Sequence, residues 1–175
     1  LEIGPDARRM DETQARQLLR AGGVDMPDVD VAELTEHTEG WPAGLYLAVL
    51  SIRARGLKAK GAATFSGSDR LVSDYLRSEL LAHLDADDLR FLTRTAVLKE
   101  MSGPLCDEVL EVSGSAAILE SYARSNLFVV PLDANEEWYR YHHLFQELLQ
   151  RELTLAEPDL IPRLLTRASL WCEAN

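Results

Sequence analysis

The chain has 175 residues, 46% of them hydrophobic and 27% charged, and its formal net charge at pH 7 is −11. These fractions are typical of a globular protein with one large domain or two small ones. Affinity for nucleic acids comes largely from lysine and arginine side chains that neutralise phosphates, so this acidity predicts no direct nucleic-acid binding. The best candidate for a membrane span, Gly44 to Ile52, falls well short of the roughly 20 residues required, and we expect no membrane partner.

Both ends of the chain indicate a piece of a longer protein. Residues 1–5 are typical of an extended strand entered midway, and residues 171–175 stop inside an amphipathic helix pattern. Cys106 and Cys172 lie far apart in apolar helical surroundings. Such cysteines favour buried thiols over a disulfide, and they predict a reducing, cytoplasmic location.

Helix signals in the first third of the chain predict a group of three helices. Asp11 and Gln14 have the spacing of a capping box at the start of the first helix. The third helix has proline in its first turn and is apolar on nearly every side, so we expect it to be buried. The predicted helices run from Asp11 to Gly22, from Pro27 to Gly40, and from Pro42 to Gly56.

The next segment is predicted to be a linker over residues 57–67, followed by two helices. The first begins at Ser68 or Asp69 and is expected to continue to Leu84, because leucines recur at helical spacing throughout it. The second is capped by Asp85 and runs from Ala86 to Leu98. We interpret the acidic residues at its start as helix-start charges.

The order of elements after residue 100 favours a winged helix. Two short helices are predicted from Ser102 and from Gly114 to Asn126, followed by strands at 127–132 and 137–141 that a turn connects. Three helices followed by a two-stranded hairpin is the winged-helix order. A helix from His142 is then broken at Pro158, and a last helix over 159–174 would fit the start of a helical-repeat array.

No complete catalytic site is visible in the sequence. The chain lacks a phosphate loop, a dinucleotide fingerprint, a nucleophile elbow and paired metal-ligand spacing. The adjacent residues His142 and His143 would point about 100° apart on a helix, so they are poorly placed to share one metal.

Two segments stand out as candidate nucleotide-binding elements. In Thr38 to Leu45, a glycine ends one helix and Pro42 begins the next, so the free N–H groups of that helix could face a nucleotide, although the same residues also suit a plain helix junction. In Trp138 to Phe145, His142 lies between a strand and a helix. That histidine could cap the helix, fill the core, or donate a hydrogen bond to a phosphate.

Read together, these segments resemble the maltose-regulator (MalT-like) group of STAND ATPases, whose members include LuxR-type transcriptional activators. Gly40-Trp41-Pro42 matches the Gly-x-Pro motif of the helical lid in that family, and Tyr141-His142-His143-Leu144 resembles its winged-helix histidine motif. Shorter matches also lie at 74–76, 91–98, 105–107 and 125–128. One departure is His143, where many relatives have proline.

The resemblance implies a domain division and a set of partners. It assigns residues 1–56 to the end of a nucleotide-binding core and a helical lid, 57–67 to a linker, 68–157 to a winged-helix domain and 158–175 to the start of helical repeats. It implies Pro42 near the adenine and His142 near the phosphates of ADP, where a protonated imidazole would add roughly 1.5–3 kcal/mol. ATP or ADP with Mg would bind to the longer protein, not to this chain alone.

The expected function is therefore that of a non-enzymatic regulatory module, whose effector the sequence does not identify. It would couple ATP/ADP state to activation through the upstream core and the downstream repeats. The same module within a Ser/Thr protein kinase, or a protein–protein scaffold without nucleotide sensing, remains open. A DNA-binding repressor is disfavoured, because the candidate recognition helix at 115–126 has only Arg124 set against Glu120.

Overall fold

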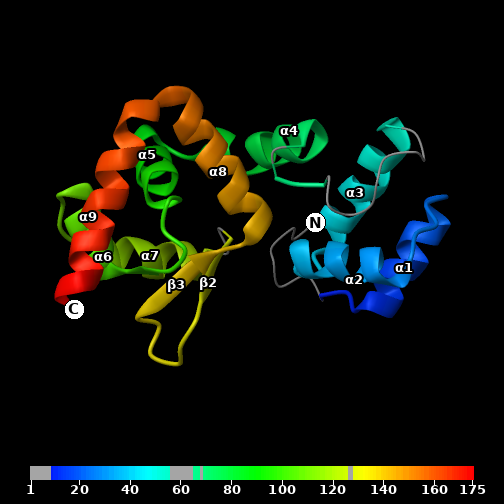
Figure 1. The fold of residues 1–175 in the computed structure, drawn as a ribbon, viewed down its shortest axis with the longest axis horizontal. Coiled ribbons are helices and arrows are strands. Elements are labelled where there is room, and N and C mark those ends of the chain that lie inside the picture. The colour runs from blue at the N-terminus through cyan, green and yellow to red at the C-terminus, as the bar shows by residue number, and fades with distance from the viewer. Residues whose placement is uncertain (1–8, 56–64, 68, 126–127) are drawn as a thin grey trace.

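The computed structural model describes residues 9–55, 65–67, 69–125 and 128–175. The first helices lie at one end of the molecule, the helices and sheet of the second half lie at the other, and α4 lies between them (Figure 1). Within the described ranges no helix is both long and apolar enough to cross a membrane. The strand expected at residues 1–5 and most of the expected linker lie outside the described residues.

The three helices predicted for the first third of the chain are present, and we refer to this group, α1 to α3, as the lid. They are α1 (Glu12–Ala21), α2 (Asp28–His37) and α3 (Pro42–Arg55). The capping box is confirmed, since the Asp11 carboxylate accepts from the Gln14 N–H at 2.8 Å and the Gln14 side chain accepts from the Asp11 N–H at 3.1 Å. Helix α1 packs against both other helices, and α3 buries Leu45, Leu47, Ala48 and Val49 but exposes Tyr46.

The helix predicted to reach Leu84 ends earlier. Asp69 caps α4 (Arg70–Glu79), and a 3-10 turn, η2 (Leu81–His83), follows it. The long prediction was wrong because Leu80, Leu81 and Leu84 still pack against the core. Over one turn, an apolar stripe does not distinguish 3.6 residues per turn from 3.0.

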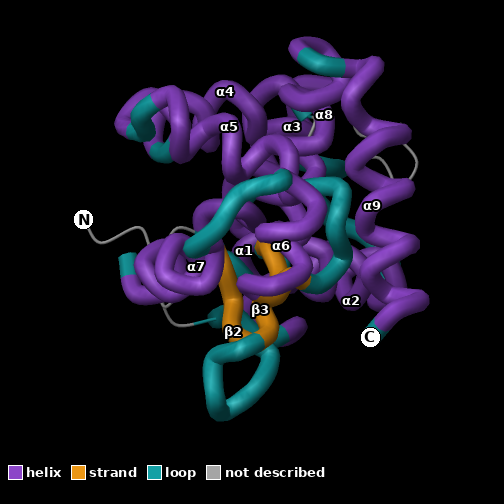
Figure 2. The backbone as a smooth tube through the Cα atoms, turned by 90° about the vertical axis from the view of Figure 1, so that its left-hand side faces the viewer, coloured by secondary structure: helices purple, strands orange, loops and turns teal. Residues whose placement is uncertain are grey.

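The second half has the predicted winged-helix order with one strand added. Its elements are α5 (Ala86–Thr95), β1 (Met101–Ser102), α6 (Gly103–Leu110), α7 (Ser115–Arg124), β2 (Val129–Pro131) and β3 (Trp138–Tyr141). The predicted two-stranded hairpin is confirmed as β2 and β3. The short β1, which was not predicted, adds a third antiparallel strand by pairing Met101 with Tyr139, and the strand order is β1-β3-β2. The hairpin between β2 and β3 projects from the body as the wing (Figure 2).

Two further helices follow the sheet. They are α8 (His143–Ala156) and, after the 3-10 turn η3 (Pro158–Leu160), α9 (Ile161–Ala174). Gln146 and Gln150 of α8 donate to the carbonyl of Ala96 at 3.1 and 2.8 Å, which fixes α8 to the end of α5. Helix α9 packs along α6, and its Trp171 meets Trp138 of β3 edge to face. The residues at the sheet end of α8 are therefore held on a rigid support.

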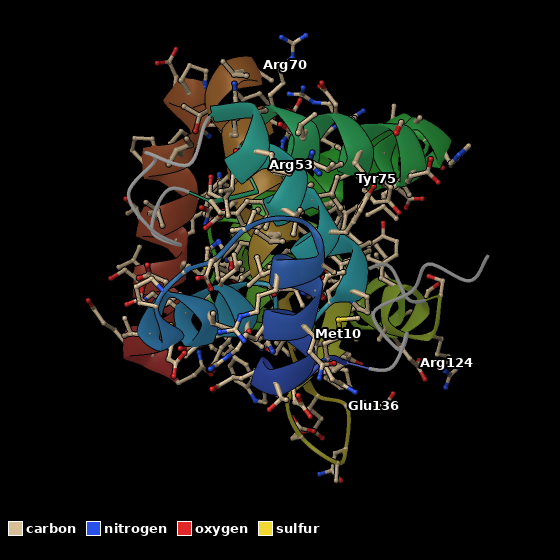
Figure 3. All side chains as sticks on the ribbon, turned by 90° about the vertical axis from the view of Figure 1, so that its right-hand side faces the viewer. Met10, Arg53, Arg70, Tyr75, Arg124 and Glu136 are labelled. Carbon is tan, nitrogen blue, oxygen red and sulfur yellow. The ribbon has the colours of Figure 1, made fainter. Side chains whose placement is uncertain are left out.

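The cysteines and α7 test two of the sequence interpretations. Cys106 is buried, and burial, aided by nearby Asp107, raises the pKa of its thiol to about 12; Cys172 is free as well but exposed, so the expectation of two buried thiols was half right. The basic residue of α7, Arg124, extends from the surface and is paired with Glu120 (Figure 3). This pairing leaves the candidate recognition helix without a free cationic face.

Candidate functional site

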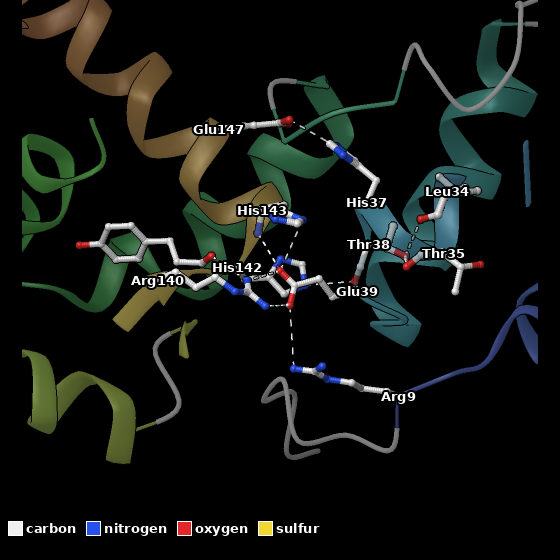
Figure 4. Close-up of polar contacts among 11 residues, drawn as sticks. Arg9, Leu34, Thr35, His37, Thr38, Glu39, Arg140, His142, His143 and Glu147 are labelled. Carbon is white, nitrogen blue, oxygen red and sulfur yellow. Dashed lines mark hydrogen bonds and ion pairs between the residues drawn. The ribbon is translucent and has the colours of Figure 1, made fainter. Parts of the chain in front are cut away.

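The two segments singled out in the sequence meet where the lid contacts the winged helix. The end of α2 and the turn after it lie against the end of β3 and the start of α8 (Figure 4). The imidazole Nε2 of His142 lies 3.1 Å from the carbonyl oxygen of Thr38, 104 residues away in the chain. Two motifs that are distant in the sequence thus meet at one place in the fold, the candidate site.

Gly40 makes the tight turn from which the site is built. Its φ of +67° is left-handed, and its N–H donates to the Thr35 carbonyl while its own carbonyl accepts from the Met10 N–H at 2.8 Å. A Cβ at this position would lie 2.4 Å from the Met10 carbonyl oxygen. Both backbone conformation and space therefore require glycine here.

We expect Gly40→Ala to destabilise the chain more than Gly23→Ala does. Gly23 also has a positive φ, +76°, but a Cβ there meets nothing within 4 Å. The free energy of unfolding of the Gly23 variant should fall by about 1–2 kcal/mol, the cost of a left-handed backbone at alanine. That of the Gly40 variant should fall by at least about 1 kcal/mol more, because its Cβ also clashes with the Met10 carbonyl. Urea denaturation of both variants checks this, and equal losses would contradict it.

Trp41 lies at the centre of a buried aromatic cluster. It is 2% exposed, and its ring lies 5.1 Å from that of Phe128 and 6.0 Å from that of His142, both edge to face. Gly44, in the first turn of α3, leaves room for the indole, since a Cβ there would lie 2.7 Å from it. Pro42, half-buried, begins α3 beside this cluster.

His142 is buried and held in one tautomer. It is 1% exposed, and because a carbonyl oxygen only accepts, its Nε2 must carry the proton that it shares with Thr38. Its Nδ1 is buried without a hydrogen-bond partner. Burial lowers the pKa of His142 to about 4, although Glu39 and the Thr38 carbonyl act in the opposite direction. In this arrangement His142 is neutral at pH 7, so the expected protonated imidazole is not the form present here.

Glu39 carries the negative charge of the site. Its carboxylate receives both Nη groups of Arg140, at 2.7 and 2.8 Å, and the backbone N–H of His143 at 3.1 Å. Arg9 approaches to 3.9 Å. Burial alone would raise the pKa of Glu39, but Arg140, His142 and the His143 N–H outweigh it and lower the pKa to about 2. Glu39 is therefore a carboxylate at every physiological pH.

A second contact closes the same interface from the other side. His37 of α2 lies 3.4 Å from the carboxylate of Glu147 on α8, and Glu147 also accepts from the backbone N–H of Gly67. The nearby Glu147 carboxylate raises the pKa of His37 against the effect of burial. The lid is thus joined to α8 at two successive points.

The predicted site residues separate into two groups. Gly40, Trp41 and His142 are brought together, whereas Pro42 adjoins them through the chain and is half-buried. Glu39, Arg140 and Phe128 were missed as site residues, although the first two lie inside the two segments that drew attention. Backbone strain marks the same place, because Glu39 and Phe128 have φ of +50° and +56° and non-glycine residues at positive φ cluster at functional sites.

The described part of the chain contains no group of three or more histidine, cysteine, aspartate or glutamate side chains that could hold a metal ion. At the interface, His37 instead pairs with Glu147 and His143 with Glu39, and the rings of His37 and His143 stack with their centroids 6.4 Å apart.

Residues 77–161 match the profile of the MalT winged helix domain. The chain therefore carries a MalT winged helix domain. This range includes Arg140 and His142 but begins after Glu39, Gly40 and Trp41, so the site lies across the edge of the matched MalT domain.

Relatives that extend over the lid fall into two kinds. The chain is 31% identical over 175 residues to the serine/threonine-protein kinase PknK of Mycobacterium tuberculosis, which covers 99% of this chain. It is 32% identical over 167 residues, 91% of this chain, to the HTH-type transcriptional regulator MalT of Serratia proteamaculans, and 28% identical over 157 residues to MalT of Vibrio campbellii. The chain spans only 16% of PknK and 18% of the Serratia protein.

Proposed function

We propose that this chain is the regulatory module of a larger cytoplasmic ATP-dependent regulator of the MalT type, in which the lid and the winged helix respond together to bound ATP or ADP. The single observation that carries the proposal is the contact of Trp41 and His142, from the two segments, in one buried cluster with rings 6.0 Å apart. A change at the nucleotide that moves either segment must move the other.

The side chains present suit one half of a phosphate-binding site. Arg140, Arg9 and the backbone N–H of His143 already surround an anion, the Glu39 carboxylate. His142 adds an N–H donor at Nε2, now used by Thr38, and a buried Nδ1 without a partner. A nucleotide phosphate would compete with Thr38 for Nε2. The rest of the nucleotide site, including Mg-binding groups, would come from the upstream core.

We expect His142→Ala in the full-length protein to release ADP faster and to raise basal activity. The loss of one hydrogen bond from a neutral donor to a charged acceptor should speed release about tenfold or more. Stopped-flow release of a fluorescent ADP analogue measures this. A suitable control is His83→Ala, since His83 lies in the turn η2, outside the site. Unchanged ADP release in the His142 variant would contradict the proposal.

The chain by itself should bind ATP or ADP weakly or not at all, because it supplies only half of the site. Isothermal titration of the 175-residue chain with ADP and Mg is the direct measurement. Tight binding would mean that the chain holds a complete nucleotide site and would overturn the division proposed above.

The match to PknK supports a second parent for the same module. PknK is a serine/threonine-protein kinase, and its similarity covers the lid as well as the winged helix. In a protein of that kind, the nucleotide-dependent movement would act on a kinase domain in place of a DNA-binding domain. The sequence on either side of this chain in its full-length protein distinguishes the two.

A further inference from the structure

Three hydrogen-bonding contacts join the end of α2 to the segment that contains His142. Thr38 accepts from the His142 ring, and Glu39 accepts from the guanidinium of Arg140 and from the backbone N–H of His143. His142, which is held through its ring, thus lies between Arg140 and His143, which are both held by Glu39 (Figure 4). No other hydrogen-bond acceptor within the described residues is assigned to the His142 ring.

The geometry of Glu39 suits it to hold Arg140 and the backbone of His143. Glu39 has a left-handed backbone, with a φ of +50°, and its side chain is only 7% exposed. On β3, the alternation of side chains buries Tyr139 and Tyr141 in the core and leaves Arg140 on the opposite face, toward Glu39. A bidentate arginine–carboxylate pair fixes direction as well as distance.

We propose that Glu39 is the positioning residue for His142: by holding Arg140 and the His143 N–H on either side, it directs the imidazole onto the Thr38 carbonyl. This inference rests on the proposed function, because it explains how a sensing histidine is kept in one orientation. Its physical content, the coupling of Glu39 to the His142 ring, does not need a nucleotide.

The other contacts of His142 do not fix the direction in which its ring points. Its backbone N–H donates to the Phe128 carbonyl at 2.8 Å, which fixes the main chain but not the ring. The rings of Trp41 and Phe128 contact it edge to face and exclude water without selecting a nitrogen. The choice of Nε2 for Thr38 therefore depends on the relative placement of the two chain segments, and Glu39 sets that placement.

The test is Glu39→Gln in the 175-residue chain, with Glu157→Gln as the matched control. Glu157 makes the same kind of bidentate pair with Arg94, at 2.9 and 2.7 Å, at the far end of α8. Long-range proton–nitrogen NMR reports the His142 tautomer and the exchange of its Nε2–H with water. We expect exchange to become roughly tenfold to a hundredfold faster in the Glu39 variant, as the loss of a charged hydrogen bond allows, and to stay unchanged in the control.

The pKa of His142 separates positioning from a simple loss of charge. The groups that face the ring are Glu39, the Thr38 carbonyl, His143 and Arg140, and Glu39 raises its pKa through its charge. If the ring stays in place without that charge, its pKa should fall below about 4. If the ring is released toward water, its pKa should rise toward the ordinary value of 6.5. We expect the rise.

A second variant, His143→Pro, removes the His143 N–H without breaking α8. Proline is well tolerated at the first position of a helix, and His142 has the extended backbone, φ −61° and ψ 137°, that a residue before proline requires. We expect faster Nε2–H exchange here too, by about tenfold.

If both variants fold and neither changes His142 exchange or tautomer relative to the Glu157 control, Glu39 does not position the ring. If Glu39→Gln fails to fold, the His143→Pro result alone decides. If Nε2–H exchange becomes faster in these variants as expected, but ADP release is unchanged in the full-length His142→Ala protein, the nucleotide role is rejected and the positioning role stands.

Discussion

Trp41→Ala is expected to destabilise the chain by about 3–5 kcal/mol, one of the largest losses available to a single substitution here. The indole is 2% exposed and touches the rings of Phe128 and His142 from the winged helix and Tyr75 from α4. Removal would leave a cavity that the surrounding rings cannot fill, because Gly44 and the buried backbone of α3 provide no side chain to collapse into it.

Chemical denaturation followed by far-ultraviolet circular dichroism measures this loss. The matched control is Tyr46→Ala on the same helix, whose side chain is 54% exposed and should change stability by less than about 0.5 kcal/mol. Because Trp41 connects the lid to the winged helix, the variant should also lose the single cooperative transition. A loss below about 1 kcal/mol would show that the cluster is not the packing centre of the interface.

Local signals in the sequence were sufficient for most helix starts. Asp11, Asp69, Asp85 and Ser102 each accept a hydrogen bond from a backbone N–H in the first turn of the helix they were expected to cap. Such caps depend only on residues within three positions, so a single sequence contains the whole of the information. The winged-helix order followed from these starts and from the hairpin pattern.

What the sequence could not give was structure made by distant partners. Strand β1 has two residues and exists only because Met101 and Ser102 pair with Tyr139 and Trp138. The early end of α4 is likewise decided by packing, since the apolar spacing continues past it. Neither feature has a local signature.

The site residues also divide into those that have a local signal in the sequence and those that depend on a distant partner. Gly40, Trp41 and His142 were selected because glycine, proline and histidine at helix boundaries are conspicuous and resemble known motifs. The Glu39–Arg140 pair joins residues 101 positions apart, and each residue alone is an ordinary charged side chain. Only the fold shows that the Glu39 side chain is 7% exposed and that its carboxylate holds Arg140 and the backbone N–H of His143, on either side of His142.

Acid is expected to weaken the folded chain in two successive steps that belong to this site. The pKa of His142 is lowered from 6.5 to about 4 in the folded chain, so the unfolded chain binds more protons between these values. The contribution of His142 is fully present above about pH 6.5 and is lost as the pH falls through 4, amounting to about 3 kcal/mol. The contribution of Glu39, whose pKa is lowered from 4.5 to about 2, is lost only below about pH 4.5.

Unfolding free energies measured in urea at a series of pH values should therefore fall as the solution is acidified below neutrality. His37 acts in the opposite sense, since its raised pKa stabilises the folded chain at low pH and this contribution is lost as the pH rises through the folded value. It should make the decrease shallower only around and above the ordinary histidine pKa of 6.5 and should not reverse it, because burial opposes the upward shift that the Glu147 carboxylate causes.

His142→Gln isolates the first step. A glutamine amide reaches as far as the imidazole Nε2 and can donate to the Thr38 carbonyl, but it binds no proton in this range. The variant should thus lose the decrease between about pH 6.5 and 4 and keep the decrease below about 4.5, which Glu39 supplies. If the wild-type and variant curves run parallel through both ranges, His142 is not the buried neutral histidine that joins the lid to the winged helix.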